Sequence, residues 1–451
     1  MINLYTKIVT NLIFPLHERL KKHDTVAIKN KMEQSQWWTS EEILDLQLQR
    51  LKILLLNVNK HVPYYKKMFT ETGFNPERIT SVNDLQLLPF LTKEVIRENM
   101  EALKADNALG LSRFNTGGSS GEPLIFFIGT ERVSHDVAAK WRATRWWDVD
   151  IGDPEIVVWG SPIELGAQDR IKQIRDKLLR TELISAFEMS EKNLNIFLQK
   201  IIDFKPKMLF GYPSSLSLIA GHARKKGIDV SGLGVKVAFV TSEKLYDHQR
   251  EKIEQTFNCK VANGYGGRDA GFIAHQCPAG SMHITAEDII VEIVDNEGNN
   301  LPAGEAGEIV VTHVATKDFP FIRYKTGDVG VLTNDKCRCG RGLPVLKEIQ
   351  GRATDFVVAA DGTVLHGLAL IYEVRDIAGV VNFKIVQENI KHTIVQLVVN
   401  DMFDSYSKEQ ISSGIKKRLG EDVNVEVELL PHINKEASGK YRYIVSKVNV
   451  T

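Results

Sequence analysis

Cysteine is scarce in this chain, with four among 451 residues. A fold held together by disulfides needs a higher density, so the composition predicts a reducing compartment and we expect a cytoplasmic protein. The apolar stretch Ile8 to Leu16 is too short to span a bilayer, and Thr10, Asn11 and Pro15 interrupt it. It also lacks the pattern of a secretory signal peptide, so we expect no integral membrane segment. We interpret it as an amphipathic helix that packs on the protein, with contact to a membrane surface as the alternative.

An excess of charge of either sign is also missing, because 57 Lys and Arg residues balance 57 Asp and Glu residues. The chain as a whole therefore has no general attraction for polyanions, and we expect no nucleic-acid partner. The hydrophobic content of 43% and the charged content of 25% are ordinary for a globular protein. A chain of this length exceeds what one hydrophobic core usually holds, which predicts two domains.

The spacing of apolar residues divides the first 350 residues into three regions. Residues 1–105 have mostly helical spacing, and Thr39–Glu42 predicts a helix start. Between 125 and 260, short apolar strands alternate with helical stretches, which is typical of βαβ units and a largely parallel sheet. Residues 283–350 have shorter strands and turns, and they predict an antiparallel β-subdomain.

A second compact unit is expected after the segment Gly351 to Ala353. Its pattern predicts strands near 382–386, 393–399 and 423–429 and helices near 367–377 and 407–419. The prediction is therefore an α/β protein with a large N-terminal domain, residues 1–352, and a small C-terminal α+β domain, residues 353–451.

A loop rich in glycine and hydroxyl groups lies between Phe114 and Leu124. Glycine allows the backbone to turn so that several N–H groups converge on an anion, and small hydroxyl side chains add donors. No Gly-Lys-Ser/Thr follows, so the loop is not of the Walker A type. It can hold phosphate oxygens or form an ordinary surface turn. The residues concerned are Thr116, Gly117, Gly118, Ser119, Ser120 and Gly121.

Four further motifs follow this loop along the chain: Asn263–Asp269 (NGYGGRD), Arg323–Asp328 (RYKTGD), Gly351–Asp355 (GRATD) and Ser438–Arg442 (SGKYR). Together and in this order, the five motifs resemble those of the adenylate-forming superfamily, which includes the acyl-CoA ligases. Within it the chain resembles the phenylacetate–CoA ligase family, close to its branch associated with capsular polysaccharide biosynthesis. The N-terminal segments Val62–Lys66 and Leu88–Lys93 fit the same family.

The resemblance implies a fold with a large adenylation domain and a small mobile C-terminal domain, and it implies how ATP is bound. The glycine and serine loop would hold the phosphates. Tyr265, between Gly264 and Gly266, would lie against the adenine, and Glu243 would lie close to the substrate and the adenine. Asp328 would bind both ribose hydroxyls, for which a carboxylate has paired acceptors.

The resemblance also implies the catalytic groups. Lys440 would neutralise charge between the substrate carboxylate and the α-phosphate, and Arg352 would contact ribose or phosphate. Asp269 stands where the family has an acid that helps to hold magnesium. Two positions depart from the family pattern: Arg268 replaces a threonine, and Thr354-Asp355 replaces the Asp-Asp of the hinge.

Three cysteines and one histidine form a separate candidate site. Cys277 and His283 lie close together in the sequence, and Cys337 and Cys339 follow in a glycine-rich turn. Three thiolates and an imidazole are a complete tetrahedral set for structural zinc. The alternative is a group of unliganded thiols with a core histidine. Cys259 lies outside this set, as a small apolar residue in a strand.

The resulting hypothesis is an AMP-forming carboxylate ligase that uses Mg-ATP and passes the acyl group to coenzyme A. Its rival shares the first step but delivers the acyl group to an amine, such as an amino sugar in surface-polysaccharide or natural-product biosynthesis. A third hypothesis, from another class, is a catalytically silent nucleotide-binding protein. The small-molecule partners would be a carboxylic acid, ATP and either coenzyme A or the amine.

Overall fold

The structure is a computed structural model that describes residues 4–115, 124–159, 170–186, 189, 191–351, 356–375, 377–433 and 444–448. The chain divides into two compact units. The first contains Met1–Phe114 and Ile125–Gly351, and the second contains Asn115–Leu124 and Arg352–Thr451. Each unit is described by itself.

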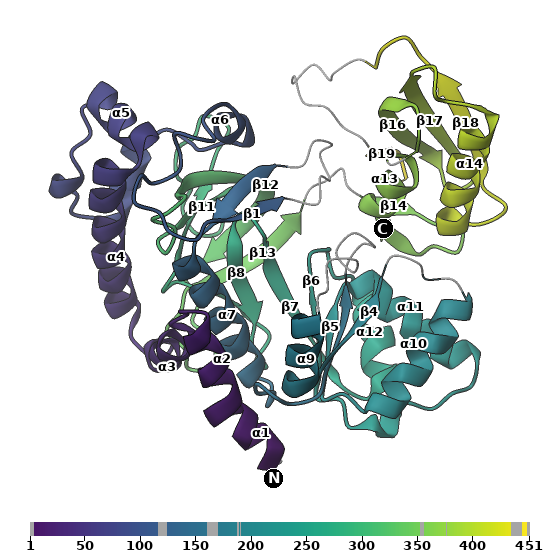
Figure 1. The fold of residues 1–451 in the computed structure, drawn as a ribbon, viewed down its shortest axis with the longest axis horizontal. Helices are drawn as coiled ribbons and strands as arrows, with labels where there is room; N and C mark the ends of the chain where they lie inside the picture. The colour runs from purple at the N-terminus through teal and green to yellow at the C-terminus, as the bar shows by residue number, and fades with distance from the viewer. Residues whose placement is uncertain are drawn as a thin grey trace. The chain divides into compact units, whose positions relative to one another are not determined.

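The first hundred residues are helical, as the apolar spacing predicts (Figure 1). The expected helix start is confirmed, because the Thr39 hydroxyl accepts from the Glu42 N–H at 3.2 Å and the Glu42 carboxylate accepts from the Thr39 N–H at 2.8 Å. This capping box satisfies two backbone donors at the start of the longest of these helices. The elements are α1 (Leu4–Ile8), the π-helix η1 (Val9–Ile13), α2 (Phe14–Leu20), α3 (Thr25–Ser35), α4 (Ser40–His61), α5 (Pro63–Thr72), the 3₁₀-helices η2 (Pro76–Arg78) and η3 (Val82–Leu87), and α6 (Lys93–Glu98).

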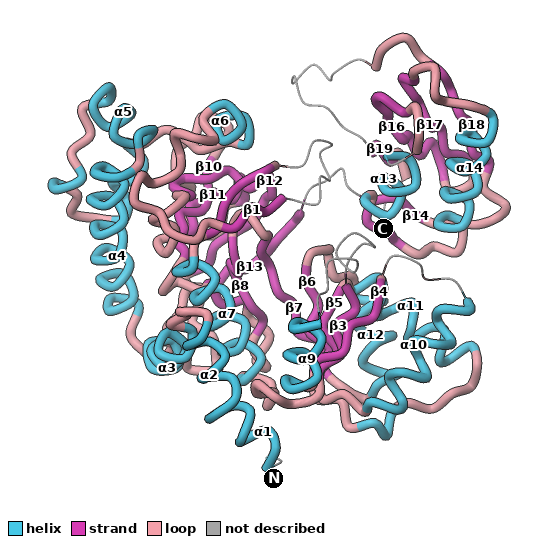
Figure 2. The backbone as a smooth tube through the Cα atoms, in the orientation of Figure 1, coloured by secondary structure: helices cyan, strands magenta, loops and turns pink. Residues whose placement is uncertain are grey.

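One sheet of eleven strands organises the first unit, in the order β10-β11-β12-β13-β9-β8-β7-β6-β5-β3-β4. The run from β4 to β7 is parallel, and the run from β7 to β10 is antiparallel. Its strands are β3 (Glu155–Trp159), β4 (Thr181–Ser185), β5 (Met208–Gly211), β6 (Val237–Thr241), β7 (Lys260–Gly267), β8 (Gly271–Gln276), β9 (Met282–Ile284), β10 (Ile289–Val294), β11 (Ala306–His313), β12 (Phe321–Thr333) and β13 (Val345–Gly351). The magenta strands of Figure 2 show this arrangement. The predicted antiparallel region is therefore present, but it continues the parallel sheet through the β7–β8 pair and is not separate from it.

Helices cover the parallel part of the sheet, and successive strand residues point to opposite faces. On one face, α10 (Glu191–Phe204), α11 (Pro213–Lys225) and α12 (Asp247–Phe257) pack on strand residues such as Ile156 and Leu209. On the other face, α7 (Thr130–Arg145) contributes Ala143 to a cluster with Phe210 and Phe239. Trp146, Trp147 and Trp159 are partly buried and pack against this second cluster. The remaining elements of the unit are α9 (Arg170–Leu179), the 3₁₀-helix η4 (Ser231–Leu233) and a two-stranded sheet of β1 (Ser112–Asn115) and β2 (Ile125–Ile128).

The second unit is a small α+β structure around its own core. Its four-stranded sheet has the order β18-β17-β16-β19, and a two-stranded sheet of β14 and β15 precedes it. Leu370 and Ile371 of α13 and Ile411 and Ile415 of α14 are buried in that core. The strands and helices expected here are all found. They are β14 (Phe356–Val358), β15 (Val364–His366), α13 (Leu368–Arg375), β16 (Val380–Asn389), β17 (His392–Val399), α14 (Ser405–Leu419), β18 (Asn424–Leu429) and β19 (Ile444–Ser446).

Among the residues that the structure describes, no helix combines the length and the apolar character needed to cross a membrane.

Candidate active site and cysteine cluster

Parallel strands β3, β5, β6 and β7 end at the same edge of the large sheet, where ligands bind in open α/β sheets. Trp159 ends β3, and its ring stacks on Tyr212 at a centroid distance of 4.4 Å. Glu243 follows β6, and its carboxylate accepts from the Ser214 N–H at 3.1 Å, at the start of α11. Glu243, which the resemblance places near the substrate, thus contacts the start of α11 at this edge.

Two glycines of the NGYGGRD motif are required by close packing. A Cβ at Gly264 would lie 2.9 Å from the Phe239 ring, and a Cβ at Gly266 would overlap the carbonyl oxygen of Gly271. Any larger side chain at either position would push β7 away from a neighbouring strand. These glycines therefore fix the path of β7, and with it the position of Tyr265 between them.

Tyr265 and Asp328 are joined by a hydrogen bond. The phenol of Tyr265 donates to Oδ2 of Asp328 at 2.9 Å. Asp328 lies in a bulge of β12, since the pairing with β11 passes from Lys325 to Val329 without a register partner between them. Gly327 has φ +81° there, a conformation that favours glycine. The bulge turns Asp328 toward β7, so two motifs far apart in sequence form one site.

Asp269 lies in the turn between β7 and β8 and has a partner that sequence reasoning missed. The phenol of the fully buried Tyr324 donates to Oδ2 of Asp269 at 2.6 Å. Tyr324 belongs to the same RYKTGD motif as Asp328, so the motif supplies both contacts to the β7 region. The position of Tyr324 in that motif was the available sequence signal.

A second contact that the sequence did not predict supports the turn between β7 and β8. Nη2 of Arg132, in α7, donates to the carbonyl oxygen of Arg268 at 2.8 Å. Arg132 is buried and pairs with Asp136 at 3.4 Å, which in turn lies 3.5 Å from Nε2 of His313. Burial raises the pKa of Asp136, but Arg132 and His313 outweigh it and hold this pKa below its usual range. Arg268, which departs from the family pattern, therefore has its backbone held in place by α7.

Several predicted site residues lie outside the described part of the chain. They are the loop residues Thr116, Gly117, Gly118, Ser119, Ser120 and Gly121, the hinge residues Thr354 and Asp355, and the two basic residues Arg352 and Lys440. Their neighbours are described: β1 and β2 pair on either side of the loop, and Gly351 pairs with Val329, next to Asp328.

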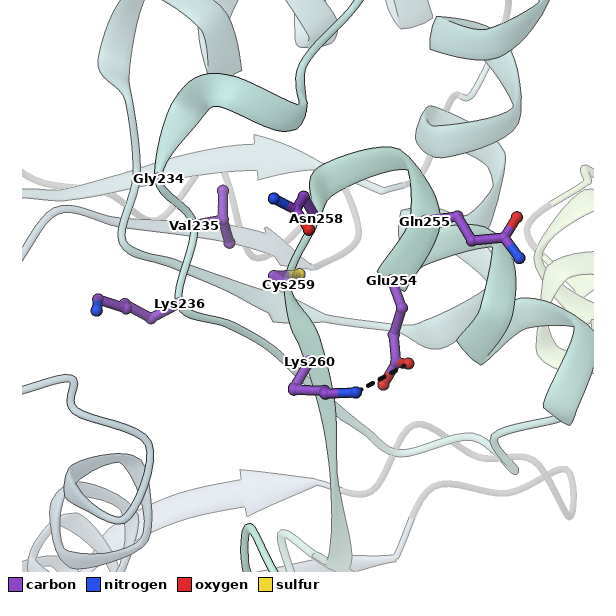
Figure 3. Close-up of a pocket in the computed structure, with 8 residues that line it drawn as sticks. All are labelled: Gly234, Val235, Lys236, Glu254, Gln255, Asn258, Cys259 and Lys260. Carbon is purple, nitrogen blue, oxygen red and sulfur yellow. Dashed lines mark ion pairs between the residues drawn. The ribbon is translucent and has the colours of Figure 1, made fainter.

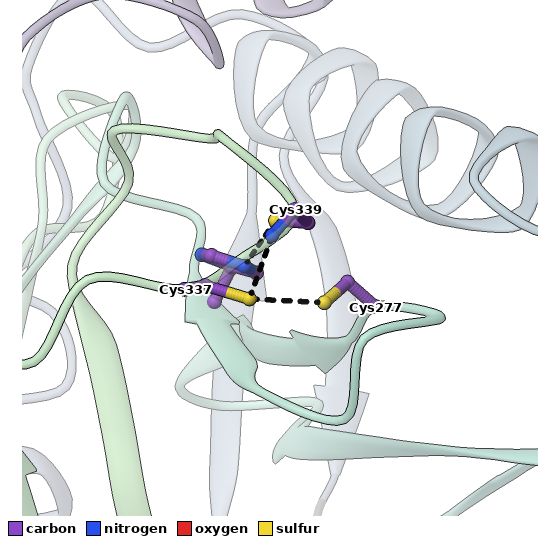
Figure 4. A group of neighbouring side chains, drawn as sticks. Cys277, Cys337 and Cys339 are labelled. Carbon is purple, nitrogen blue, oxygen red and sulfur yellow. Dashed lines mark hydrogen bonds between the residues drawn. The ribbon is translucent and has the colours of Figure 1, made fainter.

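The four predicted zinc ligands come together, and Figure 4 labels the three cysteines among them. Their donor atoms all lie within 4.8 Å of one another. The sulfurs of Cys277 and Cys337 are 3.6 Å apart, and the Cys339 sulfur is 3.2 Å from Nε2 of His283. Zn–S bonds of about 2.3 Å in a tetrahedron place two sulfurs about 3.8 Å apart, so the donor set has dimensions that suit zinc.

The surroundings of the cluster orient its ligands. Nδ1 of His283 lies 3.2 Å from the Leu343 carbonyl oxygen, which assigns the proton to Nδ1 and leaves Nε2 toward the cysteines. Burial lowers the pKa of His283 to about 4, so the imidazole is neutral at pH 7. Burial raises the pKa of the Cys277 thiol to about 11. A thiol with such a pKa ionises in proteins when a cation lies close to it.

The loop that holds Cys337 and Cys339 is fixed against the N-terminal helices. Its Arg341 guanidinium lies over the rings of Trp37 and Trp146, at 4.7 and 4.4 Å from their centroids. A Cβ at Gly342 would overlap the carbonyl oxygen of Trp38, so only glycine allows this approach. The cysteine cluster therefore joins the end of β8, the start of β13 and the helical N-terminal region.

A separate surface pocket lies at the opposite ends of β6 and β7 (Figure 3). Its volume is about 560 Å³, and Lys236, Cys259 and Lys260 are among its lining residues. Lys260 pairs with Glu254 at 3.9 Å. Burial raises the pKa of the Cys259 thiol to about 12, so this cysteine is un-ionised. The pocket adjoins the amino ends of the strands and does not belong to the site described above.

The fold is similar to that of solved 2-hydroxyisobutyryl-CoA ligase structures. A crystal structure of 2-hydroxyisobutyryl-CoA ligase with 2-HIB-AMP and CoA in the thioesterification state aligns with a TM-score of 0.66 and 21% identity, covering 91% of each chain. The postadenylation state of the same ligase aligns with a TM-score of 0.61 and 20% identity, covering 92% of this chain and 91% of that one.

Sequence comparison narrows the relationship. The chain is 26% identical to Protein CapK of Staphylococcus aureus over 444 residues, which are 96% of this chain and 94% of that protein. It is 25% identical over 332 residues to the phenylacetate-coenzyme A ligase of Thermus thermophilus, covering 70% of this chain and 72% of the relative. Residues 357–447 match the CapK C-terminal domain family. The chain is thus similar to CapK over nearly its whole length and to the phenylacetate-coenzyme A ligases over about 70% of it, in agreement with the resemblance of its motifs.

Proposed function

We propose that the protein is an AMP-forming carboxylate ligase. In the first step a carboxylate oxygen of the substrate attacks the α-phosphorus of ATP, a new O–P bond forms, and pyrophosphate leaves. In the second step the thiol of coenzyme A attacks the acyl carbon, and AMP leaves with the C–O bonding electrons while the thiol loses its proton. The products are an acyl-CoA thioester, AMP and pyrophosphate.

The observation that carries this proposal is the hydrogen bond between Tyr265 and Asp328 at the carboxyl end of the parallel strands. The bond holds the Asp328 carboxylate, a group whose paired acceptors suit a ribose diol, beside an aromatic ring suited to adenine. The similarity to phenylacetate-coenzyme A ligases over about 70% of the chain supports the same reaction class.

The charged groups of the reaction are assigned on the motifs. Two anions meet when the carboxylate approaches the triphosphate, so the reaction needs cationic and backbone donors around the α-phosphorus. We assign the Thr116–Gly121 loop to the phosphates, Arg352 to ribose or phosphate, and Lys440 to the charge that develops between carboxylate and α-phosphate. A lysine on a flexible stem suits that last role, because its ammonium is a mobile point charge.

Two metal sites belong to the proposal. Asp269 would offer a carboxylate oxygen to the magnesium ion that accompanies ATP, and the Tyr324 phenol orients that carboxylate. Cys277, His283, Cys337 and Cys339 would hold a structural zinc ion. Four protein ligands leave no open coordination position, so this zinc would stabilise the fold and take no part in the reaction.

Two molecules are candidates for the acceptor of the acyl group in the second step. Coenzyme A is the acceptor named for the phenylacetate relatives, whereas the match over 96% of the chain is to CapK, and the second unit matches the CapK C-terminal domain. An amine, such as an amino sugar, is the second candidate acceptor, because the motifs resemble the branch associated with capsular polysaccharide biosynthesis. A cytoplasmic location would supply ATP and coenzyme A to either reaction.

The decisive experiment is pyrophosphate release from Mg-ATP across a panel of aromatic, aliphatic and hydroxy acids, with coenzyme A, with amino sugars, or with neither. The matched pair of variants is Lys440→Ala and Lys417→Ala, because Lys417 is an exposed lysine of the same unit, in α14. We expect release with one class of acid, a loss of at least a hundredfold in Lys440→Ala, and no change in Lys417→Ala.

Formation of AMP and a thioester only with coenzyme A would establish the ligase, and release that depends on an amine would establish the rival. ATP binding by calorimetry without pyrophosphate release for any acid would favour the third hypothesis, a catalytically silent nucleotide-binding protein. Equal rates in the two lysine variants would contradict the role given to Lys440.

A further inference from the structure

The N-terminal helical segment has one face fixed to the protein. Elements α1, η1 and α2 follow one another without a break from Leu4 to Leu20, because the residues at both junctions, Ile8 and Phe14, have α-helical dihedral angles. Val9 is fully buried and Phe14 nearly so, in a core with Trp141 and Ile151. The Thr6 hydroxyl donates to Asp153 at 2.8 Å. The segment is therefore docked firmly, and its other face has a fixed direction.

The opposite face carries a stripe of large apolar side chains that nothing in the described part of the chain covers. They repeat every fourth residue, and we call them the leucine stripe: Leu4, Ile8, Leu12, Leu16 and Leu20, with exposed fractions of 73, 43, 64, 57 and 77%. Single exposed apolar residues are ordinary, but five in one row mark an interaction surface.

The π-helix keeps this stripe straight. In an α-helix of about 3.6 residues per turn, side chains four apart drift steadily around the axis. The π-helical turn Val9–Ile13 closes i→i+5 hydrogen bonds and so holds more residues per turn, which turns the row back the other way. A repeat of four lies between the two periods. The backbone and the sequence repeat thus agree in placing the five side chains along one line.

Every exposed charged group from residue 4 to residue 22 is cationic. These groups are Lys7, Arg19, Lys21 and Lys22. The single acidic residue in this range, Glu18, is buried with 4% exposure and is held by His17, His23 and Thr25. The positive charge is local, because the whole chain has equal numbers of basic and acidic residues.

A second helix extends the surface. Helix α9 packs on η1, and the Tyr5 hydroxyl donates to the Leu178 carbonyl oxygen at 2.9 Å. Ile174 and Leu178, one helical turn apart in α9, are 60 and 43% exposed, and Lys177 between them is exposed as well. The acid of this helix, Asp176, is neutralised by Arg175. Helix α9 thus repeats the combination of exposed apolar and cationic groups.

We propose that the leucine stripe docks the protein on the surface of an anionic lipid bilayer. A helix with an apolar face and cationic flanks lies in the interface, where the apolar side chains enter the acyl boundary and Lys and Arg meet anionic headgroups. The charge argues against a second copy as the occupant, since a symmetric pair would bring the cationic groups of both copies together. The whole protein stays peripheral and requires no spanning helix.

The test is co-sedimentation of the full chain with vesicles of phosphatidylcholine alone or with about one third phosphatidylglycerol. We expect binding to the anionic vesicles that weakens as salt is raised. Leu12→Glu combined with Leu16→Glu should lower the partition coefficient at least tenfold, and Lys7→Gln combined with Lys21→Gln and Lys22→Gln should lower it roughly a hundredfold.

The matched control is Leu44→Glu combined with Ile53→Glu, which changes two exposed apolar residues of α4 in the same way. This variant should bind as the parent chain does. Circular dichroism and sedimentation velocity are measured on every variant, so that unfolding is recognised. Equal binding by the stripe variant and the control would overturn the proposal. The proposal would also be overturned if the parent chain bound neither kind of vesicle. It would be overturned as well if the parent chain were a dimer that Leu12→Glu with Leu16→Glu converts to a monomer.

Discussion

The phenol of Tyr265 donates a 2.9 Å hydrogen bond to Asp328, and this bond joins the last residues of the parallel sheet to a bulge in the antiparallel part. It fixes the plane of the aromatic ring and occupies one oxygen of the carboxylate. The partner of Asp269, Tyr324, lies four residues before Asp328 on the same strand. Strand β12 therefore positions both acids of the proposed ATP site.

Tyr265→Phe removes the bond to Asp328 and keeps the ring. A hydrogen bond to a charged group contributes about 1.5 kcal/mol, so we expect the KM for ATP to rise about tenfold while the KM for the acid stays the same. The measurement is pyrophosphate release at varied ATP. Tyr5→Phe is the matched control, because it removes one phenol bond, to Leu178, far along the sequence from the motifs. An unchanged KM for ATP in Tyr265→Phe would show that the hydrogen bond between Tyr265 and Asp328 does not contribute to ATP binding.

Tyr324→Phe removes the 2.6 Å bond that orients Asp269. The Ala270 N–H still donates to Oδ1 of Asp269, but Oδ2 loses its partner and is oriented less firmly. We therefore expect the magnesium concentration for half-maximal rate to rise about threefold to tenfold. Titration of magnesium at saturating ATP and acid measures this directly. Tyr265→Phe serves as the comparison, since it should change the ATP requirement more than the magnesium requirement. If Tyr324→Phe instead changed mainly the ATP requirement and Tyr265→Phe mainly the magnesium requirement, the roles proposed for the two tyrosines would be wrong.

Patterns of short range predicted the fold well. The alternation of strands and helical stretches predicted the parallel sheet, and the capping residues Thr39 and Glu42 predicted the start of α4. The continuity of the sheet through the β7–β8 pair was not predictable, because it depends on which strand edge the chain returns to. Pairing between edges is a property of the assembled sheet and leaves no periodicity in either strand.

In the candidate site, likewise, the residues that lie in motifs were predictable, and the residues that depend on the packing of the fold were not. The motifs named Tyr265, Asp269 and Asp328 directly, and Tyr324 stood in a quoted motif without a role. Arg132 could not have been found, because its contact with the Arg268 carbonyl depends on how α7 is turned against the sheet. A buried arginine in a helix also looks, in sequence, like any solvated one.

The cysteine cluster gives a prediction about metal. The protein as purified should contain one zinc ion, and Cys337→Ser with Cys339→Ser should remove it and lower the melting temperature by roughly 5 to 10 °C. Loss of the metal would release the loop that Arg341 holds against Trp37 and Trp146, so tryptophan fluorescence should change as well. Metal analysis by mass spectrometry and thermal denaturation measure both effects.

Cys259→Ala is the matched control for the metal prediction. Cys259 is buried in the core between the sheet and its helices, outside the cluster. This variant should lose stability through the small cavity it creates while keeping its zinc. Zinc-free parent protein with an unchanged melting temperature after chelation would favour the alternative, a group of unliganded thiols.

Acid should destabilise the first unit through His275. Burial and, to a smaller extent, the nearby Arg142 together lower the pKa of His275 to about 3, so the folded state keeps the imidazole neutral. The unfolded chain binds a proton near pH 6.5, so this contribution to stability is fully present above that pH and is lost as the pH falls toward 3. Between pH 7 and pH 5 the loss is about 2 kcal/mol from this residue.

His275→Leu tests this directly, since it removes the titrating group and keeps an apolar side chain of similar size between Phe239 and Phe272. Urea denaturation followed by tryptophan fluorescence reports on the first unit alone, because all six tryptophans lie in it. The variant should lose about 2 kcal/mol less than the parent chain between pH 7 and pH 5. His392→Leu, at a partly exposed histidine of the second unit, should leave that loss unchanged. If both variants lose as much stability as the parent, other buried groups carry the acid sensitivity, and the low pKa of His275 has no influence on folding in this range.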